Sequence, residues 1–273
     1  MHQHTAIIRF YEELNDFLPA PHRKRDIEYR FKGRPSVKHA IEAHHVPHTE
    51  VDLVLVNNMS VGFDHHIDHG DRVAVYPVFE GLDISPVTRL RPEPQRRTAF
   101  LLDVHLGKLA RLLRTLGFDA AFSGSLDDSG IIRRALAEER IILTRDRRLL
   151  HARVITHGYC IRSQDPMKQV GEVLRRFDLH RKIRPFRRCL RCNGCLEDVT
   201  KAEVFNLLEP KTRLYYERFR RCGECGQVYW KGSHYAGLAE QVKQLLTGGG
   251  RPGTDPRTEP VKGPCRTPPG PGR

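Results

Sequence analysis

Apolar and polar positions alternate through the first 80 residues in a way that predicts a small mixed sheet with one helix. Five strand-like runs are bounded by turn residues, at positions 5–11, 26–31, 51–56, 59–63 and 72–78. A short helix that ends at Ala43 is predicted after the second run, with Ser36 as its N-cap. The predicted order of elements is therefore strand, strand, helix and three further strands.

From residue 99 the pattern changes to short, continuous apolar runs that alternate with helical segments. The apolar runs are residues 99–102, 120–122, 140–144 and 154–162. Helices are predicted between them, the first with a leucine stripe that stops at Gly117. This alternation predicts a parallel sheet with right-handed crossovers, in which ligands gather beyond the carboxyl ends of the strands.

Two segments lack such a pattern. Residues 82–98 are proline-containing, show no sustained periodicity and are predicted to be a linker. Residues 247–273 are rich in Gly and Pro, so they have too little apolar surface to bury. We expect this second segment, which includes Cys265, to be a disordered tail.

Length and composition exclude two classes of protein. The chain has 273 residues, which is enough for about two domains. No apolar run approaches the roughly 18 residues of a membrane-spanning helix. The N-terminus also lacks the basic and apolar regions of a secretory signal. We therefore expect a cytoplasmic protein with no membrane partner.

The net charge of +13 is unevenly distributed. Residues 1–80 contain 9 Lys and Arg against 12 Asp and Glu, whereas residues 81–273 contain 37 against 21. The positive charge thus belongs to the second part of the chain. A basic module of this kind favours a polyanionic partner, most simply nucleic acid, and a solvated basic surface is the alternative.

Carboxylates stand at the ends of two predicted parallel strands. Asp103 and Asp146 each come after an apolar run, and two carboxylates at adjacent strand ends repel unless a cation compensates them. Mg²⁺ or Mn²⁺ held by such acids can activate water to attack a phosphodiester. Asp127 or Asp128 is the candidate third ligand, whereas helix capping explains Asp165. The alternative for Asp103 and Asp146 is also a role as a turn residue or helix cap.

Basic side chains follow the first of these acids. Lys108, Arg111 and Arg114 are spaced by three and lie off the leucine stripe of the predicted helix. Together they are candidates for a basic ridge that binds RNA backbone phosphates. A solvated helix face explains the same spacing.

Four of the seven cysteines form two C-x-x-C pairs, Cys189 with Cys192 and Cys222 with Cys225. Four thiolates in two such knuckles make a closed, structural Zn²⁺ site. In a chain without an export signal, this spacing favours a metal over disulfides. Cys195 forms an overlapping pair with Cys192, and the sequence alone leaves that register open.

The first segment resembles the β-grasp fold of ubiquitin-like sulfur-carrier proteins of the MoaD/ThiS kind. The resemblance rests on the runs VDLVLVNNMSVGF and HGDRVAVYPVFEG. In that family the chain ends in Gly-Gly, whereas here Gly81 is a single glycine followed by 192 residues. We therefore expect an adaptor or substrate-docking module with an unknown protein partner, and no carrier chemistry.

The rest of the chain resembles the Mut-seven C-terminal RNase family. The resemblance rests on FLLDVHLGKLARLLRTLGFDA, IILTRDRRLL, RPFRRCLRCNG and CGECGQVYWKGSHY. It implies a ubiquitin-like domain at 1–81, a PIN-like nuclease with a parallel α/β sheet at 99–182 and a zinc ribbon at 183–238. It also implies a metal-dependent RNase whose acidic site contains Asp103 and Asp146.

The combined interpretation is a ribonuclease that depends on Mg²⁺ or Mn²⁺, with structural Zn²⁺ and RNA as its substrate. The rival is a non-catalytic RNA-binding or adaptor protein in which the acids serve only as caps and turns. The two hypotheses differ in whether the acids converge on one open cleft.

Overall fold

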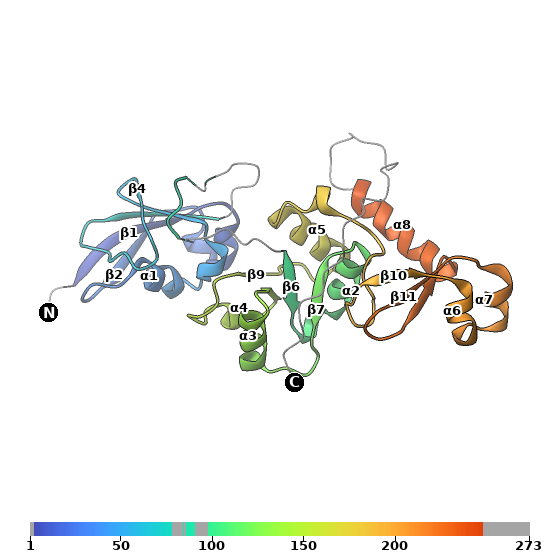
Figure 1. The fold of residues 1–273 in the computed structure, drawn as a ribbon. Helices are drawn as coiled ribbons and strands as arrows, with labels where there is room; N and C mark the ends of the chain where they lie inside the picture. Colours follow the sequence, from blue (N-terminus) through green and yellow to red (C-terminus); the bar gives the residue numbers. More distant parts are fainter. Residues whose placement is uncertain (1–2, 78–83, 85, 91–97, 248–273) are drawn as a thin grey trace. The chain divides into compact units, whose positions relative to one another are not determined.

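A computed structural model of the chain describes residues 3–77, 84, 86–90 and 98–247 (Figure 1). Contacts along the backbone divide the chain into two compact units. The first unit contains Met1–Arg97, Asp128–Leu136 and Ile141–Cys160, and the second contains Thr98–Asp127, Ala137–Arg140 and Ile161–Arg273.

The N-terminal module of the first unit is a five-stranded mixed sheet with one α-helix against it (Figure 1). Its strands, in the order β2-β1-β5-β3-β4, are β1 (His4–Phe10), β2 (Ile27–Phe31), β3 (Leu53–Val56), β4 (Met59–Ser60) and β5 (Arg72–Tyr76). β1 and β5 are parallel, whereas the other neighbours are antiparallel. The order of elements predicted from the sequence is confirmed.

Helix α1 (Val37–Ala43) begins where the sequence predicts, because the Ser36 hydroxyl accepts the His39 N–H. Its apolar face joins Ile8 and Phe10 of β1 in a fully buried core. Three 3₁₀ helices complete the module: η1 (Glu12–Phe17), η2 (Ala20–His22) and η3 (His48–Glu50).

The first unit also contains two parallel strands from the second half of the sequence. These are β8 (Ile141–Thr144) and β9 (Gly158–Cys160), accompanied by α4 (Arg147–Leu150) and most of α3 (Asp128–Ala137). β9 is shorter than the predicted run 154–162.

These elements group with the N-terminal module because η3 contacts β9 and the loop before it. Glu50 Oε1 accepts the Cys160 N–H at 2.5 Å, and His48 Nε2 lies 2.7 Å from the Ile155 carbonyl oxygen. Both η3 side chains are buried.

In the second unit, β6 (Ala99–Leu102) pairs in parallel with β7 (Asp119–Phe122). Every residue of β6 is buried, as expected for an apolar strand covered on both faces. Helices α2 (Gly107–Thr115) and α5 (Pro166–Arg176) pack together, and η4 (Val104–Leu106) and η5 (His180–Lys182) flank them in sequence. Gly117 ends α2 in the left-handed region (φ +93°), and a side chain there would collide with the Arg184 carbonyl group.

The C-terminal part of the second unit is a three-stranded antiparallel sheet, β10 (Leu196–Val199), β11 (Phe219–Cys222) and β12 (Val228–Trp230). Between its first two strands lie α6 (Lys201–Val204), η6 (Phe205–Leu207) and α7 (Pro210–Tyr215). Its small core consists of Val204, Leu208, Phe219 and Val228. Helix α8 (Ser233–Thr247) follows, which the sequence pattern did not predict.

Part of the predicted linker folds back on the first unit. The Thr88 hydroxyl donates to the Asp52 carbonyl oxygen at 2.6 Å, and Leu90 is buried. Most of the remaining linker and the predicted tail from residue 248, with Cys265, lie outside the described residues. None of the helices in the described ranges has the length and apolar character needed to cross a bilayer.

Candidate metal centre and acidic positions

The four cysteines of the two C-x-x-C pairs come together in the second unit. Cys189 and Cys192 precede β10, Cys222 ends β11, and Cys225 lies in the turn before β12. All four Sγ atoms lie within 4.8 Å of one another. The antiparallel pairing of β10 with β11 brings the two knuckles together across more than 25 residues of sequence.

The donor set fits a tetrahedral ion. Sγ atoms of Cys189 and Cys225 are 3.6 Å apart, and those of Cys192 and Cys222 are 3.4 Å apart. A Zn–S distance of about 2.3 Å requires about 3.8 Å between sulfurs in a tetrahedron, so these two pairs need only a small expansion. At Gly194, a Cβ atom would lie 2.9 Å from Cys222 Sγ, so the close approach of the knuckles requires glycine.

Tyr229 supports this centre from β12. Its hydroxyl lies 3.1 Å from Cys189 Sγ and accepts the Leu190 N–H at 3.0 Å. Burial raises the pKa of the Cys189 thiol, but hydrogen bonds from Tyr229 and nearby backbone N–H groups outweigh burial and lower the pKa to about 7. This favours the thiolate, the form that binds metal, at Cys189, whereas burial raises the pKa of the Cys192 and Cys222 thiols.

Cys195 stands outside the four-cysteine group. Its carbonyl oxygen accepts the Gly223 N–H at 3.2 Å, and its backbone bridges to Arg188. The structure therefore places Cys189 with Cys192, and not Cys192 with Cys195, opposite the second knuckle.

Two of the predicted acids follow the strands of the second unit. The carboxyl ends of β6 and β7 lie side by side, because Leu102 pairs with Phe122. Asp103 comes directly after β6, is buried and caps η4 by accepting the His105 N–H at 2.9 Å. Asp127 is exposed and lies in the loop after β7.

The other two predicted acids belong to the first unit. Asp146 follows β8 by two residues, is exposed and caps α4 by accepting the Arg148 N–H at 2.8 Å. Capping uses its Oδ1 atom, and Oδ2 has no hydrogen-bond partner among the residues that the structure describes. Asp128 is exposed and is the first residue of α3.

Helix capping thus accounts for one hydrogen bond of each of Asp103 and Asp146. Asp165 behaves as predicted, since its carboxylate accepts the Lys168 N–H at 2.9 Å at the start of α5. In the described part of either unit, taken alone, no set of three carboxylates approaches closely enough to hold one ion.

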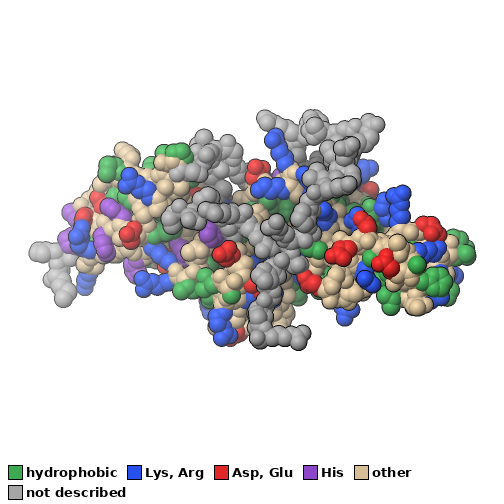
Figure 2. Space-filling view, in the orientation of Figure 1, with side chains coloured by type: hydrophobic (Ala, Val, Ile, Leu, Met, Phe, Trp, Pro, Cys, Tyr) green, Lys and Arg blue, Asp and Glu red, His purple; other side chains and the backbone are tan. Residues whose placement is uncertain are grey.

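The predicted basic ridge on α2 is wrong for one of its three residues. Lys108 and Arg111 are exposed, but Arg114 is only 6% exposed. Its Nε donates to the Ala120 carbonyl oxygen at 2.8 Å. Each step of three residues falls about 60° short of a full helical turn, so Arg114 lies about 120° around the helix from Lys108. On the face shown in Figure 2, Lys and Arg side chains are interspersed with Asp and Glu.

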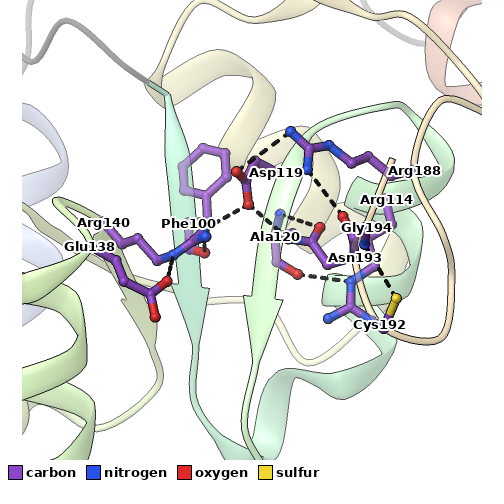
Figure 3. Close-up of polar contacts among 10 residues, drawn as sticks. All are labelled: Phe100, Arg114, Asp119, Ala120, Glu138, Arg140, Arg188, Cys192, Asn193 and Gly194. Atoms are coloured by element: carbon purple, nitrogen blue, oxygen red, sulfur yellow. Dashed lines mark hydrogen bonds and ion pairs between the residues drawn. The ribbon is translucent and has the colours of Figure 1, made fainter. Parts of the chain in front are cut away.

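Sequence reasoning missed a buried polar cluster around Asp119, the first residue of β7 (Figure 3). Its Oδ1 lies 2.6 Å from Arg140 Nη1, and its Oδ2 lies 3.5 Å from Arg188 Nη2. Asn193 Nδ2 also donates to Oδ1, at 2.7 Å. Burial raises the pKa of the Asp119 carboxyl, but the two arginines outweigh burial and lower the pKa below its ordinary value. The only local sequence feature that pointed to this cluster was the position of Asp119 directly before the apolar run 120–122.

Comparisons with known families agree with the arrangement of the fold. A family model of the Mut7-C RNAse domain matches residues 98–242, which is more than half of the chain. A second family model, Mut7-C ubiquitin, matches residues 3–83. Searches of curated proteins and of solved structures find no match. The two family matches confirm the resemblance to the Mut-seven C-terminal RNase family and the ubiquitin-like character of the first segment.

Proposed function

Because the chain belongs to the Mut7-C RNAse domain family, we propose that it is a ribonuclease that hydrolyses RNA phosphodiester bonds and requires Mg²⁺ or Mn²⁺. Family membership supports a nuclease-like function. The observation that carries the metal dependence is the placement of two acids after buried strands of parallel pairs, Asp103 after β6 and Asp146 after β8. Ligands of α/β sheets gather at these strand ends.

In this proposal Asp103 and Asp146 hold the divalent ion, and Asp127 or Asp128 completes its ligand set. Carboxylate oxygens are the ligands that Mg²⁺ and Mn²⁺ prefer. When bound, the ion lowers the pKa of a water molecule and steadies the charge that develops on the phosphate. The Oδ2 atom of Asp146 supports the proposal, because capping of α4 leaves it available.

A non-catalytic RNA-binding or adaptor protein is the second candidate. Helix capping favours this candidate, because Asp103 and Asp146 each accept a backbone N–H at a helix N-terminus, a role that needs no metal. In that case the acids keep the fold, and RNA is bound without being cut.

One experiment separates the two candidates. The purified full chain is incubated with total RNA in Mn²⁺ or in chelator, and the ends of the products are sequenced. We expect discrete new RNA ends in Mn²⁺ and none in chelator. RNA binding without new ends in either condition would favour the non-catalytic candidate.

We propose that Lys108 and Arg111 bind the RNA backbone, since both are exposed on α2. RNA affinity is then expected to fall steeply with salt, because each neutralised phosphate contributes about −0.7 to the log–log slope on single strands. Replacing both residues with Ala should flatten this slope by about 1.4, measured by fluorescence anisotropy. Replacing the exposed Lys24 and Lys32 of the N-terminal module is the matched control and should leave the slope unchanged. Equal slopes for both double variants would contradict the assignment.

We propose that the four-cysteine centre holds a structural Zn²⁺ ion. The purified protein should contain about one zinc per chain, and Cys222→Ser should lower both zinc content and resistance to heat. The reason is that binding energy at a structural site is also folding energy. Zinc is measured by atomic emission, with Cys195→Ser as the control that keeps the metal. Loss of zinc in Cys195→Ser, with zinc retained in Cys189→Ser, would show that the register is wrong.

We propose that the ubiquitin-like module serves as an adaptor for a protein partner. Its Gly81 is followed by 192 residues, so a free terminal carboxylate for sulfur-carrier chemistry is not formed at this position.

A further inference from the structure

Strand β7 is bonded to β6 on one side, and side chains meet its other side (Figure 3). The Ala120 N–H donates to Asn193 Oδ1 at 2.9 Å. The Ala120 carbonyl oxygen accepts from Arg114 Nε at 2.8 Å. In a larger sheet these two backbone groups would bond to a further strand. Here Asn193 and Arg114 take the place of that strand.

The same two side chains connect β7 to the first knuckle, which is defined as residues 188–194. Asn193 directly follows the cysteine ligand Cys192. Arg114 Nη1 donates to the carbonyl oxygens of Leu190 and Arg191, at 3.0 and 3.2 Å. These are the two residues between the cysteines of the knuckle, so the backbone that presents the thiols also holds the guanidinium of Arg114.

Charge adds a second link. Arg114, Arg140 and Arg188 are buried around the single buried carboxylate of Asp119, and Glu138 pairs with Arg140 from a less buried position. A zinc ion with four thiolates is a net anion, so a loaded knuckle places negative charge beside the buried guanidinium of Arg114, which already bonds to the knuckle backbone.

We propose that Arg114 and Asn193 are positioning residues through which metal in the cysteine centre holds the outer edge of β7. This inference rests on the proposed zinc site and extends its role beyond the ribbon. β7 leads into the loop that carries Asp127, one of the proposed acidic ligands. Loss of the metal is therefore expected to release β7 and to disturb the loop that carries Asp127.

Hydrogen exchange of the full chain tests this connection, because the Ala120 N–H is bonded to a side chain of the knuckle. Asn193 has a φ of +76°, which glycine adopts without strain, so Asn193→Gly removes the side chain and keeps the backbone. In the metal-loaded variant, amides of residues 119–122 should exchange about tenfold faster or more, because two buried partners lose their bonds. Zinc content should stay near one per chain, and strands β1 and β5 should exchange as in the wild type. Asn206→Gly, at an exposed position of η6, is the control with no expected change.

Two further exchange measurements use removal of zinc from the wild type and a variant that changes the size of the side chain less. Chelation of zinc in the wild type should accelerate exchange at residues 119–122 while β1 and β5 remain protected. Arg114→Lys should do the same in the loaded protein, and Arg111→Lys should not. Unchanged exchange at 119–122 after metal is shown to be lost would overturn the proposed connection and leave the zinc site standing. A protein that takes up no zinc would overturn the zinc site itself, and the connection with it.

Discussion

Asp146→Asn is expected to cut RNA at least about 100-fold more slowly than the wild type, the scale of losing one electrostatic contact to a transition state. Asparagine caps a helix as well as aspartate does, so the start of α4 should be preserved. The variant removes the negative charge that a divalent ion needs as a ligand. RNA affinity should be retained or increase, because a negative charge that faces phosphates is lost. Single-turnover cleavage and anisotropy titrations measure the two quantities.

Asp165→Asn is the matched control for this prediction. Asp165 is exposed, like Asp146, and also caps a helix, but it accepts the N–H three residues on, of Lys168, whereas Asp146 accepts the N–H two residues on, of Arg148. The Asp165→Asn variant should cleave RNA within about twofold of the wild-type rate, because asparagine and aspartate cap a helix equally well. Equal cleavage by Asp146→Asn and the wild type would remove Asp146 from the site.

Asp119→Ala is expected to destabilise the fold by about 3–5 kcal/mol, because it leaves buried arginines without their carboxylate. Asp119 bonds to Arg140, Arg188 and Asn193, and all four side chains are buried. Its pKa is lowered in the folded protein, so this stabilisation is fully present above the ordinary carboxyl pKa. It is lost as the pH falls through the lowered pKa. Urea unfolding at neutral and at acidic pH measures both effects.

An exposed ion pair provides the comparison for Asp119. Asp198 pairs with Arg220 at 2.7 Å, but its side chain is 81% exposed. Asp198→Ala should therefore change stability by less than about 1 kcal/mol. A similar, small effect at Asp119 would show that the buried cluster is not important for stability.

Local patterns were enough to predict most strands and the four-cysteine group. The predicted run 140–144 contains three consecutive apolar residues, Ile141 to Leu143, and residues 141–144 lie wholly buried as β8, so local composition revealed the strand. The two C-x-x-C pairs are also local signals, because each pair needs only one tight turn. Their assembly into one group is reported by the structure.

Long-range polar contacts could not be predicted in the same way. Arg114 was assigned to the surface from its spacing on a helix, but its partners Leu190 and Arg191 lie more than 70 residues further along the chain. Glu50 and Cys160, which are 110 residues apart, likewise give no local signal of their contact. Charged residues of this kind are buried only because distant groups satisfy them, and a single sequence does not show those partners.

Helix α8 was missed for a different reason. Its sequence contains Gly237 and has a mixed polar and apolar pattern, which makes a weak helical signal. Contact with α5 and burial of Val242 supply the tertiary support that the local pattern lacks.

The metal dependence of RNA cleavage by the wild type tests the central claim most directly. The protein is first freed of loosely bound ions by a chelator too weak to remove zinc, and its zinc content is verified. Cleavage of a labelled single-stranded RNA is then followed as Mn²⁺ or Mg²⁺ is added. We expect no cleavage before the addition, cleavage that rises to saturation with the added ion, and about one zinc per chain throughout. Cleavage at an undiminished rate in the chelator, with no response to either ion, would contradict it.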